Sequence, residues 1–442
     1  MTFDQLVTLA VLVAVVAALI LDKERADVVA LAGAAVLLIT GAVRPVEVQG
    51  AFASPAIIAL ASLFVIAYAM ELSGLLDAAI ERMLGLCRRI GIAGLWLLIA
   101  ASGAASAFLN NTPIVVLAAP VVRDVAKSLG RSPKRYLIPV SYAAVLGGCC
   151  TLIGTSTNLL VNDMASVAGQ PRFGMFEITP VGLAVALTGG LYLFLFSGRL
   201  MNVDDEVEDP AAGGTAAVSA DHFREPGLIG GLVGSAEAFS KKVQFHPLRA
   251  FVSLAVFILV IVLSAFNVAP IAACAFTGAV LLILMRVITA DEAYQGLRPE
   301  VLMLIAGMVV LGIALEQSGL ASAATDVLIG TMESMSPLLA LIILYGVTLF
   351  ATELLSNATV AVLFTPVAVS MAEALGVSPR PFLVAIMIAA SAAFATPFGY
   401  QTNVLVYQMG GYSYADFLKV GLPLNLITWA AAVVAIQAYF PM

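Results

Sequence analysis

Two polar motifs interrupt apolar segments of the chain, at residues 108–122 (FLNNTPIVVLAAPVV) and 355–369 (LSNATVAVLFTPVAV). Amide N–H and hydroxyl groups can bind an oxyanion, while carbonyl and hydroxyl oxygens can bind a small hard cation. No Lys or Arg lies near either interruption, so a dianion bound there would need its charge offset by another group. Co-bound cations held by carbonyl oxygens are the simplest candidate. Asn111 and Asn357 occupy corresponding places 246 residues apart, which indicates a duplication.

Both motifs lie in the middle of hydrophobic runs, 92–128 and 335–375, that are too long for one simple membrane helix. We interpret each run as a re-entrant helical hairpin with the motif at its tip. Two further runs, 136–167 and 381–409, are broken by GTSTN and TPFGYQTN. Irregular backbone at membrane depth is tolerated only where it is buried in protein or lines a wet cavity. The N–H groups that begin the second arm of a hairpin attract anions.

Composition indicates an integral membrane protein. Hydrophobic residues make up 61% of the chain and charged residues 11%, whereas about a quarter of the residues of a soluble domain are charged. The two histidines lie in a polar linker, and the four cysteines lack metal-site spacing. With no visible nucleophile–base pair either, we expect neither an enzyme nor a metal centre nor a nucleic-acid partner. Asn and Thr in membrane helices can serve only as interhelical hydrogen-bond glue, but four interruptions in matching positions favour a functional site.

The two halves of the chain form a repeat. At an offset of 245 or 246, Ser73 in SGL falls on Ser318 and Pro120 falls on Pro366. The simple spans are expected at about 5–21, 26–42, 55–74, 177–198, 249–266, 269–285, 300–317 and 416–439. We therefore expect three parts: a first repeat (1–200), an acidic linker (201–247) and a second repeat (248–442). Repeats with interrupted segments at corresponding positions are typical of secondary transporters.

Charge predicts the topology. A hairpin enters and leaves on one face, so each half has five transmembrane helices and the second repeat is inverted. Placing both termini outside leaves only Arg44, Arg172 and Arg380 outside among the 21 Lys and Arg residues, which satisfies the positive-inside rule. The linker is then cytoplasmic, the first hairpin opens from the cytoplasm and the second from outside. The fold class is an all-α polytopic protein of the inner (cell) membrane, with broken helices at its site.

At these residues the chain resembles the divalent anion/sodium symporter family, also called solute carrier family 13, within the ion transporter superfamily. The hairpin motifs carry the resemblance together with GGCCTLIGTSTNLLV and ATPFGYQTNVLVY, loops that look most like those of sulfate-type bacterial permeases and algal members. It covers nearly everything except the linker, which is too short for the soluble regulatory domains of many such members. The resemblance implies a homodimer in membrane lipid, coupling to Na+ at two or more sites, and an elevator mechanism.

The resemblance also implies site residues. An anion site falls on the two hairpin tips and the loops of the broken helices: Asn110, Asn111, Thr112, Thr155, Ser356, Asn357, Thr359, Thr396 and Pro397. One sodium site falls on Ser106, Asn111, Gly154 and Asn158, and a second on Thr352, Asn357, Ala395 and Asn403. Two departures argue against dicarboxylate specificity, because the first tip begins with Asn110 where the family has serine, and Ala358 stands where the family has threonine.

The sequence as a whole predicts sodium-coupled symport of a small divalent oxyanion, with sulfate ahead of a C4-dicarboxylate. One alternative is a proton-linked anion exporter or a sodium/proton antiporter of the same superfamily, with Glu353 carrying protons; the other is a channel. Glu353 lies four residues before Asn357, and its repeat counterpart is Ala107, so it could equally support the hairpin backbone. We expect alanine at Asn162, away from the tips, to matter little for sodium and anion binding.

Overall fold

The computed structural model describes residues 2–21, 24–75, 78–79, 82, 85, 90–201, 245–266, 268–320, 335–397 and 399–441. These residues form helices joined by loops, and none of them lies in a strand. The first half contains α1 (Phe3–Leu21), α2 (Ala26–Ile39), α3 (Pro45–Phe52), α4 (Pro55–Leu72), α6 (Ile92–Ser106), α7 (Asn111–Ser128), α8 (Lys134–Gly148), α9 (Ser156–Val167) and α10 (Thr179–Leu200). The second half contains α11 (Pro247–Ala265), α12 (Ile271–Leu284), α13 (Ala290–Gly296), α14 (Pro299–Gln317), α16 (Pro337–Ala351), α17 (Asn357–Ala374), α18 (Arg380–Ala389), α19 (Gln401–Gly410) and α20 (Tyr414–Tyr439).

The second half repeats the local structure of the first. Helices α4 and α14 both begin at a proline, whose fixed φ suits a first helical turn, and both end one residue before the serine of an SGL sequence, which caps them. The glycines that follow, Gly74 and Gly319, have φ values of +71° and +72°. This left-handed conformation favours glycine because it has no Cβ. The matching SGL turns therefore have the same backbone shape, which is the physical basis of the sequence repeat at this point.

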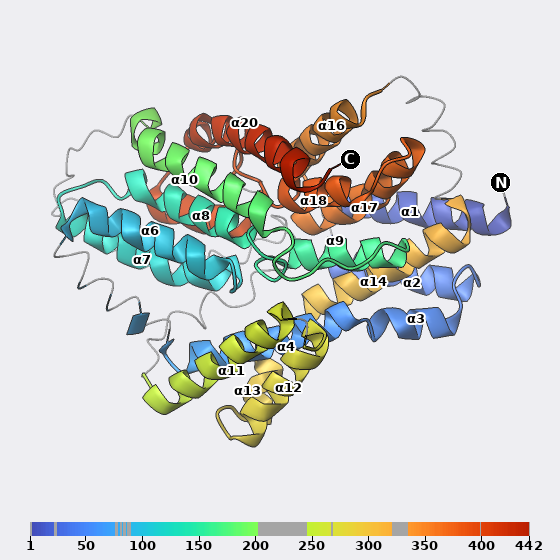
Figure 1. Cartoon of the computed structure of the whole chain (residues 1–442), viewed down its shortest axis with the longest axis horizontal. Coiled ribbons are helices and arrows are strands. Elements are labelled where there is room, and N and C mark those ends of the chain that lie inside the picture. The colour runs from blue at the N-terminus through green and yellow to red at the C-terminus, as the bar shows by residue number, and fades with distance from the viewer. Residues whose placement is uncertain are drawn as a thin grey trace.

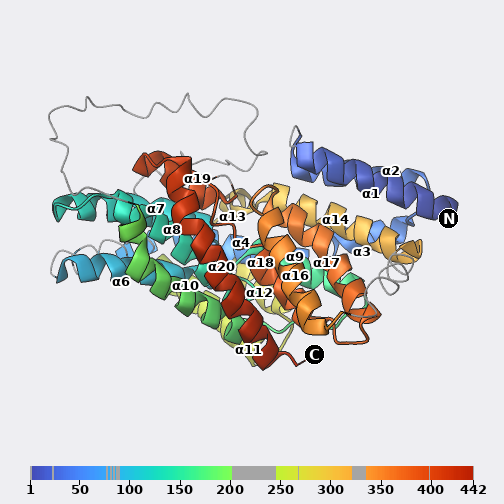
Figure 2. The same cartoon turned by 90° about the horizontal axis from the view of Figure 1, so that it is seen from above.

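The helices form two groups, and each group draws on both halves of the chain (Figures 1 and 2). In one group α2 packs on α14, and α4 packs on α11 and α12. In the other, α10 packs on α20, α6 on α8, and α16 on α18. Helix α9 connects the groups because it also contacts α4 and α14. The α6–α7 and α16–α17 hairpins lie at opposite ends of the second group in both views.

The expected interruptions are present in the described residues. Each long asparagine-containing run forms two helices, α6 with α7 and α16 with α17, and the chain reverses between them at residues 107–110 and 352–356. The breaks between α8 and α9 and between α18 and α19 span residues 149–155 and 390–400. The second break is longer because α18 already ends at Ala389. The all-helical fold with paired interruptions is therefore confirmed.

Among the described residues, six helical stretches have the length and apolar composition to cross a membrane: Pro45–Leu72 (α3 with α4), Thr179–Leu200, Pro247–Ser264, Pro299–Gln317, Asn357–Ala374 and Tyr414–Tyr439. Shorter apolar helices include both first arms of the hairpins and α18. The short helices α3 and α13, just before the third expected segment of each half, were not predicted from the hydrophobic pattern. The linker expected at 201–247 lies almost wholly outside the described residues.

Close packing of α8 on α6 depends on glycine. A Cβ at Gly147 would lie 1.9 Å from the carbonyl oxygen of Gly103, and one at Gly103 would lie 2.8 Å from the carbonyl oxygen of Ala143. Small residues of this kind let membrane helices approach until their backbones touch. Gly147 therefore serves helix packing, and this packing sets the position of the first break relative to the first hairpin.

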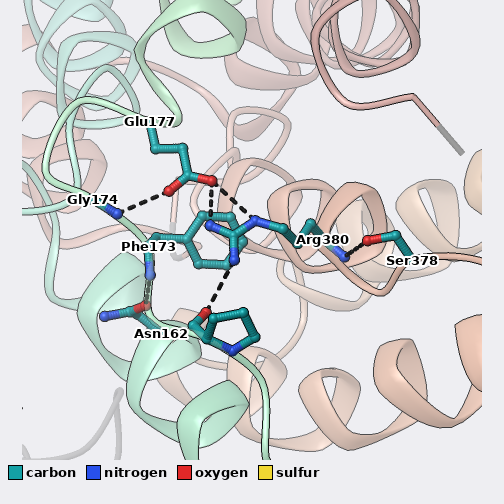
Figure 3. Close-up of polar contacts among 7 residues, drawn as sticks. Asn162, Phe173, Gly174, Glu177, Ser378 and Arg380 are labelled. Carbon is teal, nitrogen blue, oxygen red and sulfur yellow. Dashed lines mark hydrogen bonds and ion pairs between the residues drawn. The ribbon is translucent and has the colours of Figure 1, made fainter.

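A polar cluster joins the loop before α10 to the start of α18 (Figure 3). Arg380 Nε donates to Glu177 Oε1 at 3.0 Å, and Nη2 makes a second contact with the same oxygen. The guanidinium carbon lies 4.2 Å from the ring centroid of Phe173, and Nη1 donates to the carbonyl oxygen of Pro171 at 3.1 Å. Asn162 Oδ1 accepts the N–H of Phe173 at 2.7 Å. Alanine at Asn162 would leave this buried donor unmet and so lower stability, while its small expected effect on sodium and anion binding stays a prediction.

Two of the arginines expected outside lie on neighbouring loops. Arg380 donates to the carbonyl oxygen of Pro171, which directly precedes Arg172. Arg172 Nη2 lies 3.4 Å from Oδ1 of the buried Asp163. The two loops therefore share one face of the molecule, as the predicted topology requires. Which side of the membrane this face occupies stays a prediction.

Candidate functional site

Asn111 holds the first hairpin tip against the second broken helix. Ser106 Oγ donates to Asn111 Oδ1 at 2.5 Å, and Asn111 Nδ2 donates to the hydroxyl oxygen of Tyr400 at 2.6 Å. The side chain is 1% exposed. A Cβ at Gly148 would lie 2.8 Å from Asn111 Oδ1, so this glycine, unlike its neighbour, leaves space for the polar side chain of the tip.

In the second tip, Asn357 also contacts the hydroxyl five residues before it, but with donor and acceptor exchanged. Thr352 Oγ1 donates to the carbonyl oxygen of Ala390 at 2.8 Å, so its lone pairs are free for the Asn357 amide. With the amide turned to suit this acceptor, Nδ2 donates to Thr352 Oγ1 at 2.8 Å and to the carbonyl oxygen of Gly399 at 3.2 Å. The pairs Ser106–Asn111 and Thr352–Asn357 are thus formed in both halves. They bring together residues that the sequence predicted for each sodium site.

The two tips differ in how their second helices begin. Ser356 Oγ accepts the N–H of Thr359 at 3.2 Å and lies 2.7 Å from Thr359 Oγ1, so these two predicted anion ligands also bond with each other. Asn110, in the same place, makes no side-chain bond to the first turn of α7. The first tip therefore presents uncapped backbone N–H groups, whereas the second is capped by its own serine.

The loops of the two breaks are held by repeated hydrogen bonds. Asn158 Nδ2 donates to the carbonyl oxygens of Thr151 and Gly148, at 3.0 and 3.5 Å. Asn403 Nδ2 donates in the same way to Thr396 and Ala393, at 3.2 and 2.8 Å. The amide oxygens differ, since that of Asn403 accepts a bond from Ser141 whereas that of Asn158 is buried without a partner.

Each loop threonine also binds its hairpin. Thr151 Oγ1 donates to the carbonyl oxygen of Ala107, and Thr396 Oγ1 lies 3.2 Å from the carbonyl oxygen of Glu353. Ala107 and Glu353 are repeat counterparts, so the same backbone contact ties hairpin to break in both halves.

Glu353 adds a contact that the first half lacks. Its Oε1 accepts the N–H groups of Phe394 and Ala395, at 2.8 and 2.7 Å, and Nδ2 of Asn425 at 2.7 Å. Its Oε2 accepts the N–H and the hydroxyl of Thr396, both at 2.9 Å. Helix α18 ends at Ala389, four residues before the position that corresponds to the end of α8. The Glu353 carboxylate therefore accepts hydrogen bonds from backbone N–H groups that a longer helix would have bonded within itself. The arrangement fits an ionised carboxylate, because all five partners are donors.

Three helix N-termini meet the segment that begins α19. Tyr400 contacts Asn111 at the start of α7 and lies beside the Thr155 hydroxyl at the start of α9, and Gln401 Oε1 lies 3.2 Å from Thr112 Oγ1. The preceding residue, Gly399, accepts a bond from Asn357 at the start of α17. Because each N-terminus carries partial positive charge, this convergence suits an anion without any basic side chain.

Sequence reasoning missed Tyr400 and Gln401. A usable signal was present, since at the offset of 245 they fall on Thr155 and Ser156, and Thr155 was already assigned to the anion site. Thr155 caps α9 by accepting the N–H of Thr157 at 3.4 Å, whereas Tyr400 makes no such cap for α19. The correspondence is easily missed because tyrosine and threonine differ in size and shape, although both side chains carry a hydroxyl group.

The remaining predicted residues lie at the breaks. A Cβ at Gly154 would lie 2.4 Å from the carbonyl oxygen of Gly148 and 3.0 Å from that of Ala107, so several backbone oxygens gather there. Ala395 and Pro397 are buried on either side of Thr396, and among the described residues no hydrogen bond joins Pro397 to a tip. The neutral amide, hydroxyl and carbonyl oxygens suit a small hard cation, and the unpartnered Asn158 Oδ1 is an available ligand.

Sequence comparison then decides the family. The profile of the citrate transporter family matches residues 16–376 and 354–442. The chain belongs to the citrate transporter family. As a member of this family, the protein is a multi-pass membrane protein and a secondary transporter. Members of this group are named for citrate, sulfate or dicarboxylates. This agrees with the resemblance to the divalent anion/sodium symporters noted from the motifs.

Individual relatives of this family member carry related names. Sodium/sulfate cotransporter 1 of Chlamydomonas reinhardtii is 43% identical over 103 residues, which cover 22% of this chain and 12% of that protein. The sodium-dependent dicarboxylate transporter SdcS of Staphylococcus aureus is 23% identical over 368 residues, covering 77% and 68%. The crystal structure of the Alcanivorax borkumensis YdaH transporter superposes with a TM-score of 0.58 at 16% identity, covering 89% of this chain and 88% of that one. This superposition shows a shared fold.

Proposed function

We propose that the protein is a sodium-coupled symporter of a small divalent oxyanion, with sulfate ahead of a C4-dicarboxylate. The observation that carries the proposal is the convergence of the α7, α9 and α17 N-termini on residues 399–401, lined by Asn and Thr and by no Lys or Arg. Helix N-termini supply only partial positive charge. Cations bound beside a dianion there would offset its remaining negative charge. Anion binding would therefore depend on sodium.

Two cation sites flank the proposed anion site. Each combines a hairpin asparagine, the hydroxyl five residues before it, and carbonyl oxygens of the adjacent break. Ser106 with Asn111 and Thr352 with Asn357 are the repeated pairs. Since each asparagine is shared by a cation site and the anion site, binding of one ligand prepares the side chain for the other. Names of relatives that pair sodium with sulfate or with a dicarboxylate support this coupling.

We also propose an elevator-type mechanism in a homodimer. The group containing α1–α4 and α11–α14 would be the scaffold, and the group containing the hairpins and breaks would move. Division of the helices into these two packed groups supports the proposal, as does the small number of helices that connect them. In the predicted topology both termini lie outside and the linker lies in the cytoplasm.

The proton-linked alternative requires Glu353 to gain and lose a proton during transport. Five donors surround its carboxylate, and two of these groups could accept a carboxyl O–H: the Thr396 hydroxyl and, with its amide turned, the otherwise unpartnered Asn425 Oδ1. Protonation would therefore cost at least one buried hydrogen bond and would weaken the others by removing their charge. This geometry favours a constantly ionised, supporting carboxylate, and with it sodium coupling.

Uptake by proteoliposomes tests the proposal. The purified protein is reconstituted, and labelled sulfate and succinate are supplied under an imposed sodium gradient, an imposed proton gradient, or neither. We expect concentrative sulfate uptake with the sodium gradient alone. Uptake that follows the proton gradient would support the exporter or antiporter alternative, and flux that ignores both gradients would indicate a channel.

A further inference from the structure

We propose that Tyr400 restricts the anion site to compact, single-centre oxyanions such as sulfate, and excludes C4-dicarboxylates. This inference rests on the proposed function and names the residue that sets substrate size. It makes Tyr400 a specificity-determining residue, which the predicted ligand set does not contain.

The first argument is position. Tyr400 is the residue before α19, at the place that Thr155 occupies before α9. Its hydroxyl oxygen accepts a bond from Asn111 Nδ2 at 2.6 Å, across 289 residues of sequence, and lies beside the Thr155 hydroxyl. The phenol thus reaches from one broken helix across to the other and to the first hairpin tip. An anion held by these N-termini must lie against it.

The second argument is size. The two halves of the site are related by the repeat, but a tyrosine in one half faces a threonine in the other. The aromatic ring takes up volume that a pair of threonines would leave open. A dicarboxylate has its two charges on separate carbons and needs that length, whereas a tetrahedral oxyanion carries both charges on one centre. The asymmetry therefore favours the shorter ligand.

The third argument is chemistry. Because the Tyr400 hydroxyl oxygen accepts from Asn111, its own hydrogen can be donated either to the Thr155 hydroxyl beside it or to a bound anion. Asn111 is oriented for this by Ser106, which donates to its Oδ1 at 2.5 Å. The series of hydrogen bonds from Ser106 through Asn111 therefore reaches Tyr400 and fixes the position of its hydroxyl group. Hydrogen bonds to charged acceptors are stronger than neutral ones, so this donor discriminates as well as fills space.

Two substitutions separate the roles of ring and hydroxyl. Tyr400→Phe keeps the ring and removes the donor, and we expect sulfate affinity to fall about tenfold or more while succinate stays excluded. Tyr400→Thr copies Thr155 and opens the site, and we expect succinate to compete with sulfate at least about tenfold better than in the unmodified protein. The matched controls are Tyr414→Phe and Tyr414→Thr, at a half-exposed tyrosine that begins α20.

Sulfate uptake in proteoliposomes is measured with succinate and selenate as competitors, and sodium-dependent thermal protection by each anion reports binding and folding together. Selenate, a slightly larger single-centre oxyanion, should compete in all variants. If Tyr400→Thr still rejects succinate while folding normally, or if Tyr400→Phe binds sulfate unchanged, the inference is overturned. Equal use of succinate and sulfate by the unmodified protein would overturn it and leave sodium-coupled transport standing. Absence of any sodium-dependent anion uptake would instead overturn the proposed function on which it rests.

Discussion

Glu353→Gln tests whether the buried carboxylate supports the second break or carries protons. Glutamine replaces one acceptor oxygen with an NH2 group. If that group takes the place of Oε1, the N–H groups of Phe394 and Ala395 lose their acceptor, and the Asn425 amide has to turn its unpartnered oxygen toward the new NH2 group. If it takes the place of Oε2, only Thr396 is affected, and its hydroxyl can turn to the Glu353 carbonyl oxygen 3.2 Å away. The second orientation is therefore preferred.

The expected loss follows from that count. One buried backbone N–H is left unmet and the remaining bonds lose their charge, so we expect Glu353→Gln to destabilise the protein by about 2–4 kcal/mol. Glu353→Ala leaves every donor unmet and should cost more. Glu373→Gln is the matched control, because Glu373 is exposed on α17 of the same hairpin.

The assays are thermal unfolding of the purified variants and sodium-driven sulfate uptake at neutral and mildly acidic pH. We expect Glu353→Gln to lower the unfolding temperature while keeping sodium-driven uptake and its pH profile. A variant that unfolds at the normal temperature, binds sodium, and has lost transport or shows a shifted pH profile would refute the supporting role. That result would favour the proton-linked alternative.

Three further predictions concern the tips, the first break and the topology. Asn111→Ala and Asn357→Ala should each weaken sodium and sulfate binding together by roughly 5- to 150-fold in calorimetric titrations, with Thr188→Ala, exposed on α10, as the control; wild-type affinity for both ligands in either variant would contradict the site assignment. Gly148→Ala should weaken sodium binding about tenfold or more, because its Cβ would lie 2.8 Å from Asn111 Oδ1, whereas Gly190→Ala has nothing within 4 Å and should bind normally. In a cysteine-free background, Lys134→Cys should react with an impermeant reagent from the cytoplasm and Arg172→Cys from outside, and labelling of both from one side would rule out the inverted topology.

Sequence alone was sufficient to predict the all-helical membrane fold and the places where it is interrupted. These features are local, since the length of an apolar run and the presence of Asn, Gly or Pro within it decide whether a continuous membrane helix can form. The pairs Ser106–Asn111 and Thr352–Asn357 could also be predicted, because their members are five residues apart and flank a hairpin turn.

Residues that act across the two halves could not be predicted in this way. The bond between Asn111 and Tyr400 spans 289 positions, and nothing in either local sequence specifies it. Likewise the role of Glu353 depends on Asn425, which lies on α20, and on how far α18 extends before its N–H groups need another acceptor.

The sequence by itself determined a duplicated chain in a membrane, with polar breaks at matching positions, because hydrophobic length and a repeat offset can be recognised without knowing any contact. Tertiary structure decided how the copies combine. Helices α2 and α14, α4 and α12, and α10 and α20 pack across the halves, so neither repeat forms one of the two helix groups alone. It also gave two adjacent glycines different roles, because Gly147 lies against a backbone carbonyl and Gly148 lies against Asn111. Such distinctions depend on which surface faces which, and that is decided only when the whole chain packs.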